Sequence, residues 1–110
     1  NWFRTDDKGR FIWPGFGDNI RVLEWIIDRV NGRVEASETP IGKLPRIEDF
    51  DLSGLSISRE AMERLFAIDP KDWDKEISDT EQFFAKFGDR MPEELVDQLH
   101  GLKARLKGKV

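Results

Sequence analysis

The N-terminal stretch NWFRTDDKGRFIWPGFGDN, residues 1–19, holds the densest group of aromatic side chains in this sequence. Pro14, Gly15 and Gly17 are interleaved with those rings. The aromatic residues of the stretch are Trp2, Phe3, Phe11, Trp13 and Phe16. Glycine and proline fix special backbone conformations, and glycine lets a ligand approach closely. The spacing therefore favours a slot for a flat group over a strand that fills a core.

The first third of the chain predicts a β-hairpin followed by a helix. Two short strands are expected at residues 1–5 and 10–13, joined by a turn that closes at Gly9. A helix then begins at Asp18 or Asn19, either of which can cap it. Apolar residues between 20 and 30 cover one broad face of this helix, and Asn31-Gly32 ends it.

The rest of the chain predicts a long connection and three more helices. Residues 33–57 are expected to be irregular, as in loops that serve function or wrap another part of the protein. A short helix is expected from Ser58 to Ile68, a second begins at Asp69-Pro70, and Pro92 opens the last. Narrow apolar stripes on the last two predict an antiparallel helical hairpin.

The predicted fold class is therefore α+β, a short N-terminal aromatic β-hairpin followed by four helices. We divide the chain into residues 1–32, strands and a helix that form the candidate slot, and residues 33–110, the connection and a helical cap. The absence of an initiator Met and the aromatic first residues lead us to expect that residue 1 lies within a larger protein.

Composition excludes several functional classes. The chain has 110 residues with 18 basic and 22 acidic side chains, a net charge of −4, which argues against a general nucleic-acid binder. It contains no cysteine, so disulfides and thiolate metal sites are excluded. No apolar run reaches membrane-spanning length and no signal-like segment opens the chain, so neither a membrane nor a nucleic acid is expected as a partner. We expect a cytoplasmic location.

No catalytic motif is complete in this sequence. It has neither a Gly-x-x-x-x-Gly-Lys-Ser/Thr phosphate loop nor a His-Glu-x-x-His metal pair. His100, the only histidine, is predicted to be a surface or half-buried residue because no second His or Cys can complete a site. We therefore predict no catalytic and no metal-ligating residue in this chain.

The aromatic residues allow two interpretations. They can simply pack a core, which is the common role of rings at such a junction. Alternatively, Phe11 and Phe16 stack on the two faces of a flat heterocycle, and Phe3 forms a wall of the slot. In that case Asn19 recognises an edge of the heterocycle, because its amide offers both a donor and an acceptor.

At these residues the sequence resembles a known family. Residues 1–4 and 9–19 closely resemble the C-terminal segment of GTP-dependent phosphoenolpyruvate carboxykinase, and the match continues through residues 21–26 and 39–42. Residues 83–90 look like the bacterial branch of that family. Thr5 and Asp18 depart from the lysine and glutamate that are common in the family. The resemblance covers the whole chain.

The resemblance implies a reaction and a role for this segment in it. The reaction converts oxaloacetate and GTP to phosphoenolpyruvate, CO₂ and GDP, the gluconeogenic lyase and decarboxylase step, with Mn²⁺ or Mg²⁺. The family's phosphate loop, metal ligands and substrate arginines lie upstream of this segment. Its own contribution would be the guanine pocket of a larger α/β nucleotide-binding domain. By this match, the nucleotide-binding residues are Phe3, Phe11, Phe16 and Asn19, supported by Trp2 and Trp13.

The residue pattern and the family resemblance together imply partners for this chain and leave alternative functions open. The implied partners are a guanine nucleotide and the remainder of the parent enzyme. The segment alone is expected to be inactive, to bind GTP weakly, and to self-associate or be disordered near residues 1–17. The alternative is a helical protein-interaction module in which the aromatic residues are core and Asn19 is only a helix cap. A third, weaker alternative is a groove for proline-rich peptides with Trp2 and Trp13 as contacts.

Overall fold

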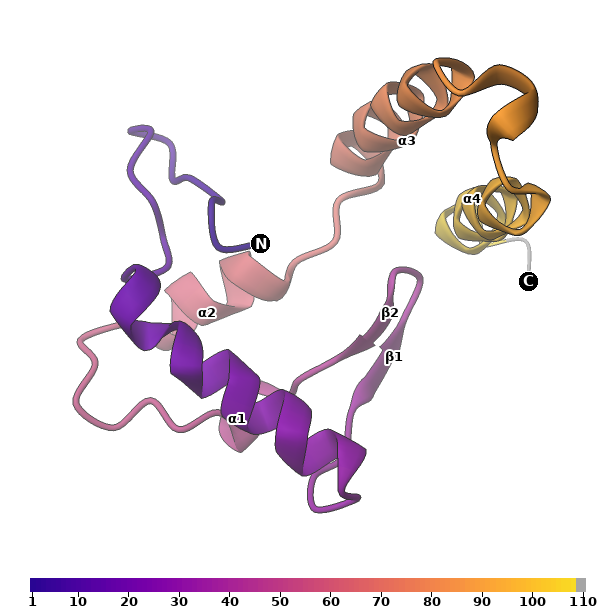
Figure 1. Cartoon of the computed structure of the whole chain (residues 1–110). Helices are drawn as coiled ribbons and strands as arrows, with labels where there is room; N and C mark the ends of the chain where they lie inside the picture. Colours follow the sequence, from indigo (N-terminus) through magenta and orange to yellow (C-terminus); the bar gives the residue numbers. More distant parts are fainter. Residues whose placement is uncertain (109–110) are drawn as a thin grey trace. The chain divides into compact units, whose positions relative to one another are not determined.

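The computed structural model describes residues 1–108 and divides into two compact units. The first unit comprises Asn1–Thr39 and Lys43–Ala67, and the second comprises Pro40–Gly42 and the residues from Ile68 onward. The helices and strands are α1 (Asn19–Val30), β1 (Ser37–Thr39), β2 (Gly42–Leu44), α2 (Arg59–Phe66), α3 (Pro70–Ala85) and α4 (Glu93–Leu106) (Figure 1). The predicted α+β class and the four helices are confirmed. Within residues 1–108 no helix is long and apolar enough to cross a membrane.

The prediction of two N-terminal strands, at residues 1–5 and 10–13, is wrong. Residues 1–13 contain one isolated antiparallel bridge, between Thr5 and Phe11, on either side of the Asp6–Gly9 turn. The turn itself forms, with the Gly9 N–H donating to the Asp6 carbonyl at 3.0 Å and Gly9 at φ 76°. A lone two-stranded ribbon gains little from its few ladder hydrogen bonds, and the Phe3 and Phe11 rings lie outside the core, so pairing stops after the bridge.

The hairpin of this structure lies instead within residues 33–57, which we expected to be irregular. Strands β1 and β2 pair with each other, and Pro40 and Ile41 form the turn between them. Proline is favoured at the second position of such a turn because its φ is already fixed, and Gly42 supplies the positive φ, 122°, that follows. Strands of three residues show no alternation long enough to be recognised in a sequence.

We predicted that Asp18 or Asn19 caps the start of α1 through its side chain; the position is correct and the side-chain hydrogen bond is not. Asp18 is the N-cap residue, but its side chain makes no capping hydrogen bond. The Asp18 carboxylate instead accepts from Arg21 Nε at 3.1 Å. At the other end Asn31 is the C-cap and Gly32 follows at φ 69°, the left-handed conformation that ends many helices.

A small aromatic core organises the first unit. Its fully packed side chains are Trp13, Trp25, Phe50 and Met62, and half-buried residues such as Val22 and Phe66 surround them. The rings of Trp13 and Phe50 meet edge to face with centroids 6.4 Å apart. Since these residues come from the N-terminal segment, α1, the loop before α2, and α2, the core joins four parts of the chain.

The apolar face of α1 does not pack into this core. Of the six apolar residues on the predicted face only Val22 is half-buried, and the other five are exposed: Ile20, Leu23, Ile26, Ile27 and Val30. Trp25, on the other side of the helix, provides the buried contact. The helix is amphipathic as predicted, but its apolar side faces away from the core of the first unit.

The helices that follow begin at their predicted signals. Ser58 Oγ accepts from the Ala61 N–H at 3.1 Å at the start of α2, and Asp69 Oδ1 accepts from the Lys71 N–H at 2.9 Å at the start of α3. Both hydrogen bonds satisfy backbone donors that a first helical turn leaves without partners. Pro70 occupies the first helical position of α3, where its missing N–H costs nothing.

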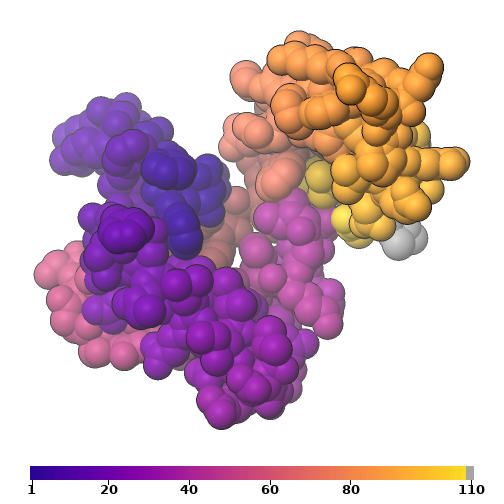
Figure 2. Space-filling view, in the orientation of Figure 1, coloured from indigo at the N-terminus to yellow at the C-terminus, as the bar shows by residue number. Residues whose placement is uncertain are grey.

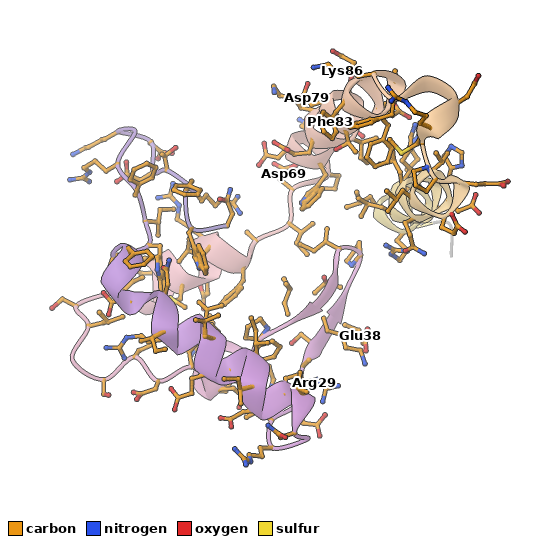
Figure 3. The ribbon with its side chains drawn as sticks, in the orientation of Figure 1. Arg29, Glu38, Asp69, Asp79, Phe83 and Lys86 are labelled. Atoms are coloured by element: carbon orange, nitrogen blue, oxygen red, sulfur yellow. The ribbon has the colours of Figure 1, made fainter. Side chains whose placement is uncertain are left out.

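Helices α3 and α4 pack together in the second unit, as the predicted helical hairpin requires. Ile77 and Leu99 are the buried residues of the pair. The start of α3 lies near the end of α4, where Pro70 and Leu106 line the same shallow hollow. Figure 3 labels Phe83 on α3 and Lys86, the C-cap residue that follows this helix; the Lys86 ammonium lies 5.9 Å from the centre of the Phe83 ring.

Candidate functional site

The two candidate stacking rings, Phe11 and Phe16, and the candidate wall, Phe3, are exposed. The exposed fractions are 73% for Phe3, 65% for Phe11 and 91% for Phe16. Trp13, only 4% exposed, lies in the core of the first unit. The interpretation of the aromatic residues as core is therefore correct for Trp13 and wrong for the three phenylalanines.

Phe3 and Phe11 are held next to each other by the Asp6–Gly9 turn. Their rings meet edge to face, with centroids 6.0 Å apart and planes inclined at 67°. The Asp6 carboxylate stabilises the turn by accepting the Lys8 and Arg10 backbone N–H groups at 2.9 and 3.0 Å. The Arg10 N–H, with smaller contributions from the Lys8 N–H and the Arg10 guanidinium, lowers the pKa of Asp6. The structure thus brings two of the three rings together.

Phe16 lies apart from that pair, on a single turn of 3₁₀ helix, Phe16–Asp18, just before α1. Gly15 precedes it at φ 133°, a conformation that L side chains rarely adopt. Within residues 1–108 no ring contact of Phe16 with another aromatic side chain is found. Its ring is thus positioned by the backbone at the start of α1 and not by packing.

Asn19 is the first residue of α1 and not its N-cap, and its side chain contacts the core. Its Oδ1 accepts a hydrogen bond of 2.8 Å from Trp13 Nε1. An indole nitrogen can only donate, so the amide oxygen of Asn19 must face Trp13 and the amide nitrogen must point away. Trp13 therefore fixes which way the Asn19 amide is turned.

Arg21 fixes the first turn of α1 to the loop before α2. Its guanidinium donates to the carbonyl oxygens of Asp51 at 2.5 Å and Ser53 at 2.9 Å, besides its contact with Asp18. The Ser53 hydroxyl and N–H, and secondarily the charge of Arg21, lower the pKa of Asp51. These contacts hold the helix start that carries Asn19, and sequence reasoning assigned no such role to Arg21.

A hollow of about 570 Å³ opens beside Phe11 in the first unit. Phe11, Pro14 and Ile57 contribute apolar surface to it, and Arg10 and Arg64 contribute positive charge. Arg64, on α2, also pairs with Asp7 at 3.3 Å. Sequence reasoning missed Arg64, because nothing in its spacing indicates that α2 lies beside the N-terminal turn.

The described residues offer no site for a bound metal. Among residues 1–108 no group of three or more His, Cys, Asp or Glu side chains is close enough to hold an ion. His100 is exposed on α4, as predicted for a surface histidine. The candidate site provides exposed phenylalanine rings and one oriented amide, the kinds of group that can stack on and hydrogen-bond to a flat polar ring.

The N-terminal part of the first unit therefore combines an exposed pair of rings, a third exposed ring at a helix start and an amide oriented by a buried indole. Comparison with known proteins identifies the family to which the chain belongs. The sequence model of the family described as phosphoenolpyruvate carboxykinase C-terminal P-loop domain matches residues 1–105. The chain belongs to this family.

Curated relatives agree with this assignment. A Corynebacterium jeikeium protein named phosphoenolpyruvate carboxykinase [GTP] is 45% identical over 107 residues, covering 97% of this chain and 18% of the relative. Proteins of the same name from Treponema pallidum and Chlamydia pneumoniae are 47% and 41% identical, with 98% and 99% of this chain and 18% of each relative covered. The chain thus spans less than a fifth of the length of these relatives.

Proposed function

We propose that this chain is the guanine-nucleotide-binding C-terminal portion of a GTP-dependent phosphoenolpyruvate carboxykinase. The reaction of that enzyme converts oxaloacetate and GTP to phosphoenolpyruvate, CO₂ and GDP, and we assign it to gluconeogenesis in the cytoplasm. The observation that carries the proposal is the Trp13–Asn19 hydrogen bond, in the same N-terminal segment as three exposed phenylalanine rings. In this proposal Phe3, Phe11, Phe16 and Asn19 bind the base.

The orientation of the Asn19 amide supports a preference for guanine. Because Oδ1 faces Trp13, the two Nδ2 hydrogens point away and can donate to a ligand oxygen. Guanine presents an acceptor, O6, where adenine presents an amino donor. An amide nitrogen aimed at that position favours guanine, since adenine would leave two donors facing each other.

The exposed rings support stacking on the base. A base–aromatic stack contributes about 1–3 kcal/mol, whereas association costs an estimated 4–15 kcal/mol. Two or three rings and one amide therefore suffice to select a base but not to bind GTP tightly. The phosphates and the Mn²⁺ or Mg²⁺ ion would be held by the rest of the polypeptide, since the described residues do not fit a metal. We expect this chain alone to be inactive and to bind GTP at about millimolar strength or weaker.

The first test is an NMR titration of this chain with GTP and, in parallel, ATP. We expect shifts at Phe3, Phe11, Phe16 and Asn19 with GTP that are smaller with ATP. Equal shifts with both nucleotides at these residues would contradict a guanine-specific site. Shifts confined to residues of α3 and α4 would favour the alternative, a helical interaction module.

The sharper test changes Asn19 in the full-length carboxykinase that carries this sequence. Asn19→Ala should reduce the preference for GTP over ATP in kcat/KM about tenfold, the effect of losing one hydrogen bond of about 1.4 kcal/mol. Asn31→Ala is the matched control, because Asn31 ends the same helix and its Nδ2 donates only to the Ile27 carbonyl. Equal effects of both substitutions, or none of either, would contradict the assigned role of Asn19.

A further inference from the structure

An apolar row runs along the exposed side of α1. It comprises Ile20, Leu23, Ile26, Ile27 and Val30, whose exposed fractions range from 44% to 81%. Four of them follow one another at three- and four-residue steps, and Ile26 widens the row toward one side. Figure 2 shows the α1 segment at the surface of the first unit. A contiguous apolar face of this kind on a folded chain marks a surface that another segment covers.

The rotation of α1 about its axis is fixed, so this row cannot turn inward. On the core side Trp25 is buried with Val22 beside it. Arg21 is held by the Asp51 and Ser53 carbonyls, and Arg29, at the end of the helix in Figure 3, donates to the Val34 carbonyl at 3.2 Å. Turning the apolar row inward would break these hydrogen bonds and expose Trp25.

We infer that the apolar row of α1 is the surface on which the remainder of the carboxykinase polypeptide packs. This inference rests on the proposed function, because it takes the covering segment from the rest of that enzyme. The relatives supply the occupant, since more than four fifths of each lies outside the region that this chain matches. A second copy of this chain is the competing occupant.

The position of the row connects the packing with the candidate site. Ile20 directly follows Asn19, and Leu23 lies one turn further along the same helix. A segment packed on the row therefore holds the helix start that carries the Asn19 amide. The row gives the rest of the enzyme a way to orient the base-binding residues without contacting the base.

Thiol labelling of the full-length carboxykinase that carries this sequence tests the inference. Residues 1–110 contain no cysteine, so Ile27→Cys places a unique thiol in the row and Glu24→Cys places one outside it on the same helix. Peptide-level mass spectrometry separates both from any thiols elsewhere in the polypeptide. The labelling rate in the native protein is compared with the rate of the same variant in denaturant.

We expect Cys labelling at position 27 to be at least about tenfold slower in the native protein than in denaturant, because a buried thiol reacts only after local opening. Labelling at position 24 should stay within about threefold of its denatured rate. Comparable rates at both positions, fast or slow, would overturn the inference. So would protection at position 27 that is lost on dilution, because that result identifies a second copy as the occupant.

Two further measurements keep the result interpretable. Hydrogen exchange of the α1 amides in the unsubstituted full-length protein reports whether the helix is protected without any substitution at Ile27. Turnover of oxaloacetate with GTP is measured on the same preparations. Activity with an unprotected position 27 contradicts only this inference, whereas protection without GTP-dependent turnover contradicts only the proposed function.

Discussion

The two units of this chain differ in how much large apolar surface they expose: among the described residues, three such side chains are exposed in the second unit (Phe83, Phe87 and Leu95) and nine in the first. In the second unit, buried Ile77 and Leu99 lie on the helices α3 and α4, which pack together. In the first unit, the aromatic core is small, while three phenylalanine rings and the apolar row of α1 are exposed. The first unit therefore has a core of its own and, in addition, exposed apolar surface, which we propose for a ligand and for further polypeptide.

The same comparison explains which predictions succeeded. The helices of the second unit begin at signals that lie within a few residues, such as Asp69-Pro70, and these signals act without help from distant parts of the chain. The conformation of residues 1–13 depends on what lies next to them. Four predictions test this contrast between the two units.

The largest expected effect is that of Met62→Ala in the core of the first unit. Met62 is 1% exposed, and truncation of such a side chain costs about 2–5 kcal/mol because it removes buried surface and leaves a cavity. Met91 is half-buried in the second unit, so the matched variant Met91→Ala should lower the free energy of unfolding by clearly less than Met62→Ala does. Urea unfolding followed by NMR measures the loss of unfolding free energy in both variants. Equal losses would contradict the proposed difference between Met62 and Met91.

The helix caps should behave alike in the two units. Ser58→Ala, at α2 in the first unit, and Asp69→Ala, at α3 in the second, should each cost about 1 kcal/mol, because each removes one hydrogen bond to a first-turn N–H. Helix-resolved hydrogen exchange distinguishes the two. A negligible cost at either site would show that packing, not the local signal, starts that helix.

Two buried tryptophans of the first unit provide a sharper comparison. Trp13 Nε1 donates to Asn19, whereas the buried Trp25 Nε1 has no partner among the described residues. Trp13→Phe should therefore cost about 0.5–1.5 kcal/mol more than Trp25→Phe, since only the first breaks a hydrogen bond. Thermal unfolding of both variants measures the difference in stability. A larger loss of stability for Trp25→Phe than for Trp13→Phe would contradict the prediction.

The smallest expected effect concerns the acid stability of the first unit. The pKa of Asp51 is lowered chiefly by its Ser53 hydrogen bonds, so the folded state favours the ionised carboxylate. The stabilisation is present above the usual pKa of 3.8 and is lost as the pH falls through the lower folded value. Asp51→Asn should therefore flatten the dependence of stability on pH below about pH 4.

The control for this pH measurement lies in the second unit. Asp97→Asn changes an exposed position of α4 and should leave the acid dependence of the first unit as it is. Urea midpoints measured at several pH values compare the two variants with the unsubstituted chain. An unchanged pH dependence for Asp51→Asn would show that the Ser53 contacts do not stabilise the folded state.

The sequence by itself determined the four helices, the caps of α2 and α3, and the choice of the candidate base-binding residues. Capping residues, proline at a first helical position and apolar periodicity act over one or two turns, so they can be read along the chain. The run around Pro14–Asn19 carries the family resemblance that the comparisons then confirmed. The division into residues 1–32 and 33–110 by function stays a prediction.

Only the tertiary structure decided what these residues contact. It replaced the predicted N-terminal strands by a single bridge at Thr5 and Phe11, because strand pairing requires partners that a local pattern cannot supply. It turned Trp13 inward to fix the Asn19 amide and left the apolar row of α1 outside. Periodicity shows that a helix has an apolar side, but which segment covers that side depends on the rest of the polypeptide.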